Sequence, residues 1–384
     1  MNVFDVYPLF DITPVRAQGA YVWDEKGDRY LDLYGGHAVI SIGHSHPHYV
    51  KRIARQLYDI GFYSNSVQMP MQQELAEKLC ELSGYHDYSL FLCNSGAEAN
   101  ENALKLASFH TGRSKVIAFK GAFHGRTSAA VAATDDEKIQ APINKTDNFI
   151  FLPLNDIAAF ENALQEHGSE LAAVIVEGIQ GVGGVQLPEP GFLQALARGC
   201  DKTGALLILD EVQSGHGRSG KFFAHQHTDL KPHLITMAKG MGNGFPVAGV
   251  LINPQIEAKH GMLGTTFGGN YLACAAALAV LEVMQEEKLM ENAHNIGQRL
   301  MHELRHLPGV KEVRGEGLMI GVELDKPCAA IRKQLLEEHQ IFTGSSSNKN
   351  TLRLLPPLCI GMREVDAFLT AFEAVLYQTE PQAI

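Results

Sequence analysis

Four stretches of this sequence join an apolar run, which predicts a buried strand, to a polar residue at its end. YSLFLCN leads into NSGAE at residues 94–98, LAAVIVE ends at Glu177, ALLILD ends at Asp210, and HLITMAK ends at Lys239. In an open parallel sheet, ligands bind at the carboxyl ends of the strands. These polar residues are therefore the first candidates for chemistry.

The segment after YSLFLCN predicts the start of a helix. Ser95 and Glu98 have the spacing of a capping box, in which the serine caps the helix and the glutamate reaches back to it. The small residues Gly96 and Ala97 also leave backbone N–H groups open, and a helix N-terminus carries about half a positive charge. Two interpretations stay open here, a cap that only stabilises the helix and a phosphate-binding site.

Asp210 and Lys239 lie 29 residues apart, about the length of one strand–crossover–strand unit. Their side chains can therefore meet at one edge of the sheet. One interpretation is a structural ion pair. The other is a reactive amine, because desolvation lowers the pKa of a lysine and allows it to form a Schiff base. The glycine-rich stretch Gly240–Gly244, which we expect to be mobile, favours the reactive amine.

A phosphate site, an acid and a lysine in one place are what pyridoxal phosphate needs. The helix N-terminus takes the phosphate, the aspartate keeps the pyridine nitrogen protonated so that the ring accepts electrons, and the lysine binds the aldehyde. Each signal is weak alone, and together they predict a pyridoxal-phosphate site.

The elements that must position these residues alternate between helix and strand from about residue 70. Helical patterns at QQELAEKLCELSG and AEANENALKLASFHTG are interleaved with the apolar runs YSLFLCN and KVIAFK, and NFIFLPL, LAAVIVE, ALLILDE and HLITMAK continue the series. Near-continuous apolar runs are typical of strands that are covered on both faces. The sequence therefore predicts the α/β class, with a large, mostly parallel, doubly wound sheet.

The two ends of the chain follow other patterns. An antiparallel hairpin is predicted at Ala20–Tyr34 and a helix at HPHYVKRIARQLYDIG. A long helix beginning near Asn270 precedes VKEVRGEGLMIGVEL, LRLLPP and the amphipathic REVDAFLTAFEAVLYQ, which together indicate a smaller α+β domain. We expect an N-terminal hairpin and helix at 1–60 that pack with the C-terminal domain, a large cofactor-binding domain at 61–275, and the small domain at 276–384.

Composition restricts the partners of this protein. The formal net charge is −11 and no run is strongly basic, which argues against binding of nucleic acid or of an anionic membrane. The six cysteines lack C-x-x-C spacing, which favours buried thiols in a reducing compartment over disulfides or zinc. The longest apolar run, in LACAAALAVLEVM, is shorter than the ~20 residues of a membrane span, and the N-terminus lacks the basic segment of a signal peptide. We therefore expect a cytoplasmic protein.

Several motifs resemble those of the class III aminotransferases of fold type I, and among these they look most like the acylornithine aminotransferases. The motifs are NSGAEANENALKLA, AFHGRT, LLILDEVQSGHGRSG, AKGMGNGFP and GTTFGGN. The resemblance covers essentially the whole chain, from VWDEKGDRYLDL to LRLLPP. It implies pyridoxal 5'-phosphate as the cofactor and a homodimer with shared active sites.

The resemblance also implies roles for individual residues, with Lys239 and Asp210 as the catalytic pair. The residues implied to bind the cofactor are Ser95, Gly96 and Ala97 at the phosphate, Phe123 on the ring face, Asp210 at the ring nitrogen, Gln213 near the ring hydroxyl, Lys239 at the aldehyde, and Thr266 at the phosphate in the neighbouring subunit. Those implied to bind substrate are Arg126, Arg353 and, for the neighbouring subunit, Thr265. No metal is implied.

The implied reaction transfers the terminal amino group of an N-acylornithine, acetyl or succinyl, to 2-oxoglutarate. Its products are the N-acylglutamate semialdehyde and glutamate, in arginine biosynthesis or in the reverse direction. Arg126 would grip a carboxylate through bidentate geometry. Two arginines suit the two carboxylates of 2-oxoglutarate and favour transfer over an aminomutase, which moves nitrogen within one substrate. Another ω-aminotransferase, acting on 4-aminobutyrate or ornithine, is the nearer alternative.

Three positions depart from the family pattern. Gly178 replaces a proline and Val182 replaces a glutamate of VEPIQGEGGV, and His37 stands where ornithine δ-aminotransferases have a substrate-gripping tyrosine. The missing glutamate normally pairs with an arginine at the position of Arg353. A cation without its partner favours a donor that brings an additional carboxylate. We therefore expect N-succinylornithine to be used at least as well as N-acetylornithine, and free ornithine poorly.

Two further motifs suggest other functions. Gly215–Gly220 matches G-x-G-x-x-G, but the following KFFAHQH is too short to be the crossover helix of a dinucleotide-binding dehydrogenase. The run HSHPH at His44–His48 could hold zinc by composition, but Pro47 suits the first position of a helix, so we expect a loop and a helix start there. A non-catalytic binding role would leave Lys239, Asp210 and Arg126 without a purpose.

Overall fold

The computed structural model describes residues 1 and 3–378 of the chain. Its largest sheet has seven strands. In spatial order they are β4 (Ser89–Cys93), β10 (Ala248–Ile252), β9 (Leu234–Met237), β8 (Leu206–Asp210), β7 (Leu171–Glu177), β5 (Lys115–Phe119) and β6 (Phe149–Leu152). Neighbouring strands are parallel except at β10, which is antiparallel to both β4 and β9. The predicted α/β class with a mostly parallel sheet is confirmed.

Strand β10 is missing from the elements predicted above. Its sequence, AGVLI, contains Gly249, which interrupts the apolar run. A Cβ at Gly249 would lie 3.0 Å from the carbonyl oxygen of Phe91 on β4, so the close approach of the two strands favours glycine. Because β10 stands between β4 and β9, the carboxyl end of β4 reaches the same edge of the sheet as those of β8 and β9.

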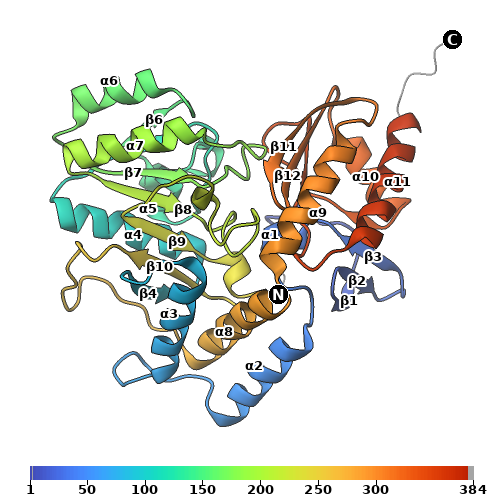
Figure 1. Ribbon diagram of the computed structural model, residues 1–384, viewed down its shortest axis with the longest axis horizontal. Coiled ribbons are helices and arrows are strands. Elements are labelled where there is room, and N and C mark those ends of the chain that lie inside the picture. Colours follow the sequence, from blue (N-terminus) through green and yellow to red (C-terminus); the bar gives the residue numbers. More distant parts are fainter. Residues whose placement is uncertain (2, 379–384) are drawn as a thin grey trace.

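Helices cover both faces of this sheet (Figure 1). Ala173 and Ile175 of β7 share a core with α4 (Gly96–Thr111), whereas Val174 and Val176 pack with α6 (Ile157–His167) and α7 (Pro190–Thr203). Successive side chains of a strand point to opposite faces, so a strand buried on both sides must be apolar throughout. The sequence LAAVIVE meets this requirement.

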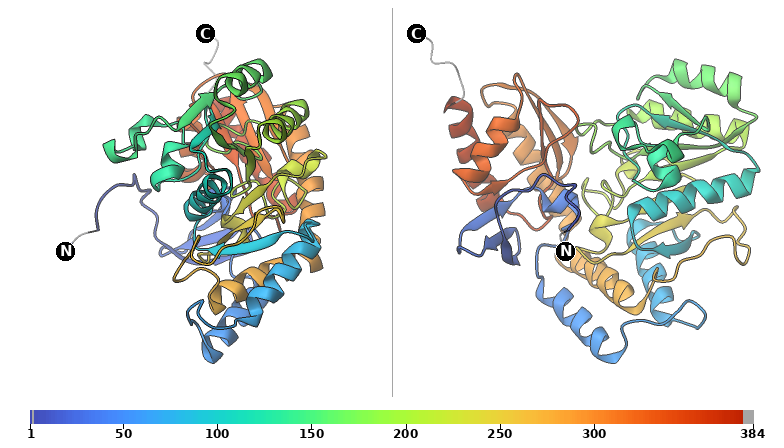
Figure 2. Two further views of the ribbon diagram at one scale, coloured as in Figure 1. Left: turned by 90° about the vertical axis from the view of Figure 1, so that its left-hand side faces the viewer. Right: turned by 180° about the vertical axis from the view of Figure 1, so that it is seen from behind.

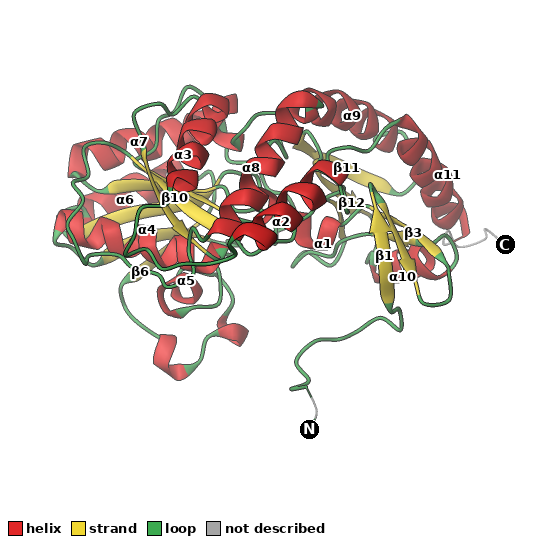
Figure 3. Ribbon diagram, turned by 90° about the horizontal axis from the view of Figure 1, so that it is seen from below, coloured by secondary structure: helices red, strands yellow, loops and turns green. Residues whose placement is uncertain are grey.

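A second sheet lies in the C-terminal part of the chain (Figures 1 and 3). Its order is β11-β12-β14, all antiparallel, with β11 at Val310–Glu316, β12 at Met319–Leu324 and β14 at Thr351–Leu354. The accompanying helices are α9 (Leu289–Leu304), α10 (Ala329–Glu337) and α11 (Met362–Gln378). The long helix expected from Asn270 is in fact two helices, because α8 (Tyr271–Glu286) ends before Lys288, which has a φ of 53°.

The predicted N-terminal hairpin is confirmed and belongs to a third sheet. The strands are β1 (Pro14–Gln18), β2 (Tyr21–Asp24) and β3 (Arg29–Asp32), and β3 pairs in parallel with β13 (Ile341–Phe342). The hairpin therefore lies beside the C-terminal helices (Figure 2). Helix α2 (Pro47–Asp59) begins at Pro47, as predicted, and packs against α8. The remaining helical segments are α1 (Gly35–Ala38), α3 (Pro70–Ser83), α5 (Ser128–Ala132) and the 3₁₀ turns Glu137–Ile139, Pro142–Asn144, Ala224–His227 and Lys239–Met241.

The division into 1–60, 61–275 and 276–384 stays a prediction. The pairing of β3 with β13 supports an N-terminal part that packs with the C-terminal domain. Position 275/276 falls inside α8, and residues 379–384 lie outside the described part of the chain. All six cysteines are unpaired. In the described residues, no helix is both long and apolar enough to cross a membrane.

The contact between α9 and the turn joining β11 to β12 leads to a stability prediction. A Cβ at Gly297 of α9 would lie 1.9 Å from the carbonyl oxygen of Gly317, a backbone atom that cannot rotate away. Gly297→Ala should therefore lower the free energy of unfolding by about 1–3 kcal/mol, as overpacked cores do. Urea denaturation followed by circular dichroism measures the change.

The matched control is Gly191→Ala in α7, where a Cβ meets nothing within 4 Å. This variant should be as stable as the parent or more stable by up to ~1 kcal/mol, because alanine favours the helix. Equal stability of the two variants would show that the α9 contact tolerates a side chain.

Candidate active site

A cavity of about 410 Å³ lies at the carboxyl ends of β7, β8 and β9, where α4 begins. The predicted site residues that line it are Ser95, Gly96, Ala97, Phe123, Arg126, Asp210, Gln213 and Lys239. Parallel strands end at one edge of a sheet, which explains why residues so far apart in the sequence meet here. Thr265, Thr266 and Arg353 are not part of this lining.

The start of α4 forms the predicted capping box. Ser95 Oγ accepts the backbone N–H of Glu98 (3.2 Å), and Glu98 Oε2 accepts the N–H of Ser95 (3.0 Å). The first intrahelical bond runs from Ala99 N to Ser95 O, so the preceding amides of Gly96 and Ala97 remain available to an anion in the cavity. The cap and an anion site are therefore compatible.

Asp210 is held as a buried carboxylate, with 3% of its surface exposed. Its Oδ2 accepts Asn100 Nδ2 (2.7 Å) and contacts His124 Nδ1 (2.7 Å), and its Oδ1 accepts Val212 N (3.0 Å). Thr236 Oγ1 donates to Asn100 Oδ1 (2.7 Å) and so fixes the orientation of the amide. These hydrogen bonds stabilise a negative charge that burial alone would disfavour.

Three of these supporting residues were not identified from the sequence. Asn100 and Thr236 look like ordinary positions of a helix and a strand, and His124 is hidden in AFHGRT. A signal for Asn100 was available, since it is a polar residue between the buried Ala99 and Ala103 of α4. A buried amide needs a polar partner, and here that partner is the candidate acid.

Glu177 is a second buried carboxylate beside Asp210, its neighbour in the register of β7 and β8. Its two oxygens accept Phe123 N (2.9 Å) and Gly181 N (3.0 Å). Burial raises the pKa of Glu177 above its usual range, His124 opposes this shift, and Asp210 adds to it. Glu177 thus anchors the two loops that carry Phe123 and Gly181.

Lys239 occupies a strained backbone position. Strand β9 ends at Met237, and Lys239 begins a 3₁₀ turn with a φ of 47°, in the left-handed region that a non-glycine residue rarely adopts. Burial lowers the pKa of Lys239, whereas Asp210 and Glu177 raise it. In the described residues the amine has no ion pair within 4.0 Å, so the structural ion pair considered above is not formed.

The glycine-rich stretch after Lys239 is packed, contrary to the expected mobility. Asn243 is 5% exposed, and its Oδ1 accepts Ser41 N (2.8 Å) and Ile42 N (3.1 Å). A Cβ at Gly242 would lie 2.0 Å from the carbonyl oxygen of Phe245. The glycines permit a tight turn, and this turn fixes the position of Lys239.

Two arginines stand at the cavity in different environments. Arg126 lines it and is exposed. Arg353 is 3% exposed and lies directly behind the wall, where its Nη1 donates to Gln213 Oε1 (3.3 Å) and its Nε to Ser345 O. Burial lowers the pKa of Arg353. Within the described residues no carboxylate pairs with Arg353, and Val182 lines the cavity nearby.

His37 lies at the same side of the site. It is in contact with the Tyr34 hydroxyl, and its carbonyl oxygen accepts Gln213 Nε2 (3.2 Å). Burial lowers the pKa of His37, and the cations Arg353 and Lys239 lower it further. Burial and the nearby cations therefore favour the uncharged form of this imidazole.

Thr265 and Thr266 lie apart from the Lys239 cavity. Thr265 Oγ1 accepts Asn94 Nδ2 (3.3 Å) and Gly268 N (3.1 Å), and Thr265 lines a separate hollow of about 970 Å³. Thr266 is exposed. Their predicted contacts with a neighbouring subunit stay a prediction.

The two alternative motifs have structural roles. The histidines of HSHPH contact three different carboxylates, since His44 meets Asp32 (2.8 Å), His46 meets Glu287 (2.9 Å) and His48 meets Glu282 (2.5 Å). The Gly215–Gly220 segment starts no helix. Its Arg218 is 2% exposed and donates to the carbonyl oxygens of Leu318 and Pro356, which ties the large sheet to the C-terminal part.

Comparisons with known proteins identify the family of this chain. The family described as Aminotransferase class-III matches residues 5–376. The acetylornithine aminotransferase of Bacillus subtilis is 42% identical over 95% of this chain and 94% of its own, and that of Nitrosomonas europaea is 38% identical over 98% and 97%.

Solved structures show the same fold. The ornithine aminotransferase of Toxoplasma gondii superposes with a TM-score of 0.90 at 30% identity over 98% of this chain and 93% of its own, and a second structure of that enzyme holds PLP in its active site at partial occupancy. The acetylornithine aminotransferase of Elizabethkingia anophelis gives a TM-score of 0.84 at 31% identity over 97% and 95%. The chain therefore belongs to the class-III aminotransferases of fold type I, which use pyridoxal phosphate as their cofactor.

Proposed function

We propose that this aminotransferase moves the terminal amino group of an N-acylornithine to 2-oxoglutarate, giving the N-acylglutamate semialdehyde and glutamate. The observation that carries the proposal is a pair of arginines, Arg126 and Arg353, at one lysine-bearing cavity. 2-Oxoglutarate brings two carboxylates, so it uses both cations. The names of the relatives above support the N-acylornithine donor, and arginine biosynthesis in the cytoplasm is the setting that suits this reaction and the six unpaired thiols.

The cavity residues fit the cofactor of this family. The free amides of Gly96 and Ala97, next to the Ser95 cap, suit its phosphate, and the aromatic side chain of Phe123, which lines the cavity, suits a ring face. Asp210, with its hydrogen bonds, suits a protonated ring nitrogen. When bound, pyridoxal phosphate supplies an aldehyde that exchanges amines and a ring that accepts electrons.

The protein's own groups then position the substrates and move the proton. Arg126 binds the α-carboxylate of the donor in bidentate fashion, so that the terminal amine points towards Lys239. The Lys239 amine, which burial keeps readily deprotonated, takes the proton from the donor carbon that bears the nitrogen. Gln213 stands between Arg353 and the ring site, and its side chain is hydrogen-bonded on both sides, to Arg353 and to His37.

A homodimer is part of the proposal. Thr266 is exposed beside Phe267, which is 61% exposed and whose ring centroid lies 5.4 Å from that of the exposed Phe62, with the two rings tilted by 46°. Exposed aromatic residues around a loop are typical of a surface that another protein covers. A second copy placed there would receive Thr265 and Thr266 at its own cavity.

Lys239→Ala should abolish turnover, by about 10⁴-fold or more, because the variant loses both the amine that binds the aldehyde and the proton carrier. The long-wavelength absorbance of the lysine-bound cofactor should disappear as well. Phosphate contacts should still retain some cofactor, which filtration and fluorescence can detect. Lys221→Ala, at an exposed lysine, is the control and should behave as the parent. An active Lys239→Ala enzyme would show that another lysine carries the chemistry.

The donor preference follows from the missing partner of Arg353. A donor with a carboxylate on its acyl group should gain a charge-assisted contact in this cationic site, of roughly 1.5–3 kcal/mol. We therefore expect kcat/KM for N-succinylornithine to equal or exceed that for N-acetylornithine by up to about a hundredfold, with free ornithine the poorest. Steady-state rates with the three donors, side by side, measure the order.

Val182→Glu should reduce this preference, since the new carboxylate would compete for Arg353. Val182→Leu keeps the site apolar and is the matched control. If acetylornithine is much the better donor and Val182→Glu leaves the ratio unchanged, Val182 acts only in packing.

Thr266→Val should weaken cofactor retention if the hydroxyl reaches the partner's cofactor. The loss of one hydrogen bond to a charged phosphate corresponds to about a tenfold weaker affinity. Retention should also fall on dilution, as the dimer dissociates, which absorbance after dialysis at two protein concentrations can measure. Thr370→Val, at an exposed threonine of α11, is the control. Full activity of a monomer in size exclusion would refute the shared site.

A further inference from the structure

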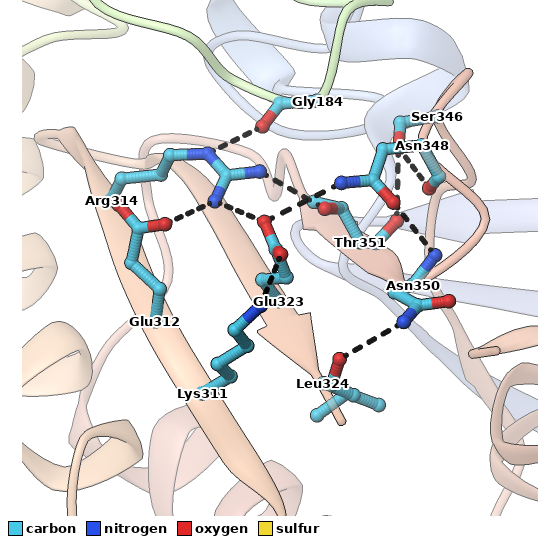
Figure 4. Close-up of polar contacts among 10 residues, drawn as sticks. All are labelled: Gly184, Lys311, Glu312, Arg314, Glu323, Leu324, Ser346, Asn348, Asn350 and Thr351. Atoms are coloured by element: carbon cyan, nitrogen blue, oxygen red, sulfur yellow. Dashed lines mark hydrogen bonds and ion pairs between the residues drawn. The ribbon is translucent and has the colours of Figure 1, made fainter. Parts of the chain in front are cut away.

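A mostly buried arginine of β11 connects the C-terminal sheet to a loop of the large sheet (Figure 4). The Arg314 side chain is 9% exposed. Its Nε donates to the carbonyl oxygen of Gly184 (2.9 Å), and its Nη2 donates to Thr351 Oγ1 (3.0 Å). One guanidinium thus bonds both to the loop after β7 and to strand β14.

The charge of Arg314 is balanced mainly by Glu323 of β12. Arg314 Nη1 meets Glu323 Oε2 at 2.7 Å, and this carboxylate is only 18% exposed. The same nitrogen meets Glu312 at 2.9 Å, but the Glu312 side chain is 57% exposed and in contact with water. The pair with Glu323 should be the stronger one, because solvent screens an exposed pair.

Glu323 also reaches a second loop, at residues 343–350. Its Oε2 accepts Asn348 Nδ2 (3.4 Å). Within the loop, Ser346 Oγ donates to the carbonyl oxygens of Asn348 (2.8 Å) and Thr351 (3.2 Å). Figure 4 shows this continuous network, which runs from Arg314 on β11 through Glu323 on β12 to Asn348 in the loop.

The two loops meet behind the substrate cavity. Ser347 donates to the carbonyl oxygen of Val182 through both its N–H (2.9 Å) and its Oγ (3.1 Å). Val182 is in the cavity wall, and Ser345 O accepts the Nε of Arg353. The position of this loop therefore decides where both Val182 and Arg353 stand.

We propose that Arg314 is a positioning residue for substrate recognition, which sets the relative placement of Val182 and Arg353 without touching substrate or cofactor. The inference rests on the proposed function in taking these two residues as part of the substrate pocket. The loop base does not depend on Arg314, because Gln180 and Gln186 pair through their backbones (2.9 and 3.0 Å) and Val185 is fully buried. Removal of the guanidinium should free the loop tip at 181–184 and leave the fold intact.

The test is Arg314→Gln, compared with the parent holoenzyme. The KM for the acylornithine donor and for 2-oxoglutarate should each rise about tenfold, while kcat changes by less than about threefold, because a loosened pocket weakens binding but leaves Lys239 and Asp210 in place. The absorbance of bound cofactor should be unchanged. Hydrogen exchange should accelerate in peptides that cover 181–187 and 343–350.

Two variants separate positioning from general stability. Glu312→Gln removes the exposed partner of the same guanidinium and should leave both KM values within about twofold. Arg314→Lys keeps the positive charge and one direction of hydrogen-bond donation. Its KM values should therefore lie between those of the parent and those of Arg314→Gln. A fall in melting temperature and kcat with unchanged KM would overturn the proposal, as would unchanged kinetics and exchange.

A double variant with Ser347→Ala tests the route through the loop. If Arg314 acts through the Ser347 contact with Val182, the KM increase of the double variant should be smaller than the product of the single increases. If the two substitutions multiply their effects on KM, Arg314 does not act through the contact between Ser347 and Val182. The 2-oxoglutarate half-reaction can be measured alone, with enzyme loaded with pyridoxamine phosphate, which supplies the amino group of the glutamate formed. This measurement needs no acylornithine, so failure of the proposed donor is distinguishable from failure of this inference.

Discussion

The buried negative charge of Asp210 is the constraint on which the rest of the site depends. A carboxylate that is 3% exposed loses most of its hydration, so the fold must supply the hydrogen bonds that water would have made. Asn100 brings one from α4, His124 one from the loop after β5, and Val212 one from the segment after β8. The observed strand order, with β10 between β4 and β9, brings these elements together. The charged state of Asp210 therefore depends on the order of the strands in the sheet.

The cations of the site are governed by the same desolvation. Burial lowers the pKa of Lys239 and of Arg353, and neither group has an ion pair within the described chain. For the lysine, burial favours the uncharged amine, which is the form that a nucleophile or proton carrier requires. For the arginine, whose pKa starts much higher, the charge persists and requires an anion from outside. In the proposed function, the lysine amine would act as the base and the arginine as the receptor for a substrate carboxylate.

Much of this arrangement could be predicted from the sequence, because strands buried on both faces, the Ser95 capping box and the strand-end acids have local signals. The residues that hold Asp210 in place could not be predicted. Asn100 and His124 contribute by contacting Asp210, which lies 110 and 86 residues further along the chain, respectively. No local sequence pattern indicates contacts of such long range. Strand β10 was not predicted because Gly249 shortens its apolar run. The packing around Gly240–Gly244 was not predicted because glycine is equally typical of mobile segments and of tight turns. The residues that were missed are those whose role depends on contacts that form only in the tertiary structure.

The loop that carries Val182 shows how such a site can change its substrate without changing its chemistry. A Cβ at Gly183 would lie 2.9 Å from the carbonyl oxygen of Gly121, a backbone atom, so glycine is favoured there, and a Cβ at Gly181, 1.7 Å from Gln213 Oε1, would displace the Gln213 side chain. Val182 is the residue of this tip whose side chain lines the cavity. Its neighbours are fixed by packing and its carbonyl oxygen by Ser347, so a substitution at 182 alters the charge next to Arg353 while Asp210 and Lys239 keep their positions. In the proposed function, substrate choice therefore depends on residue 182 and Arg353, and the chemical step depends on Lys239 and Asp210.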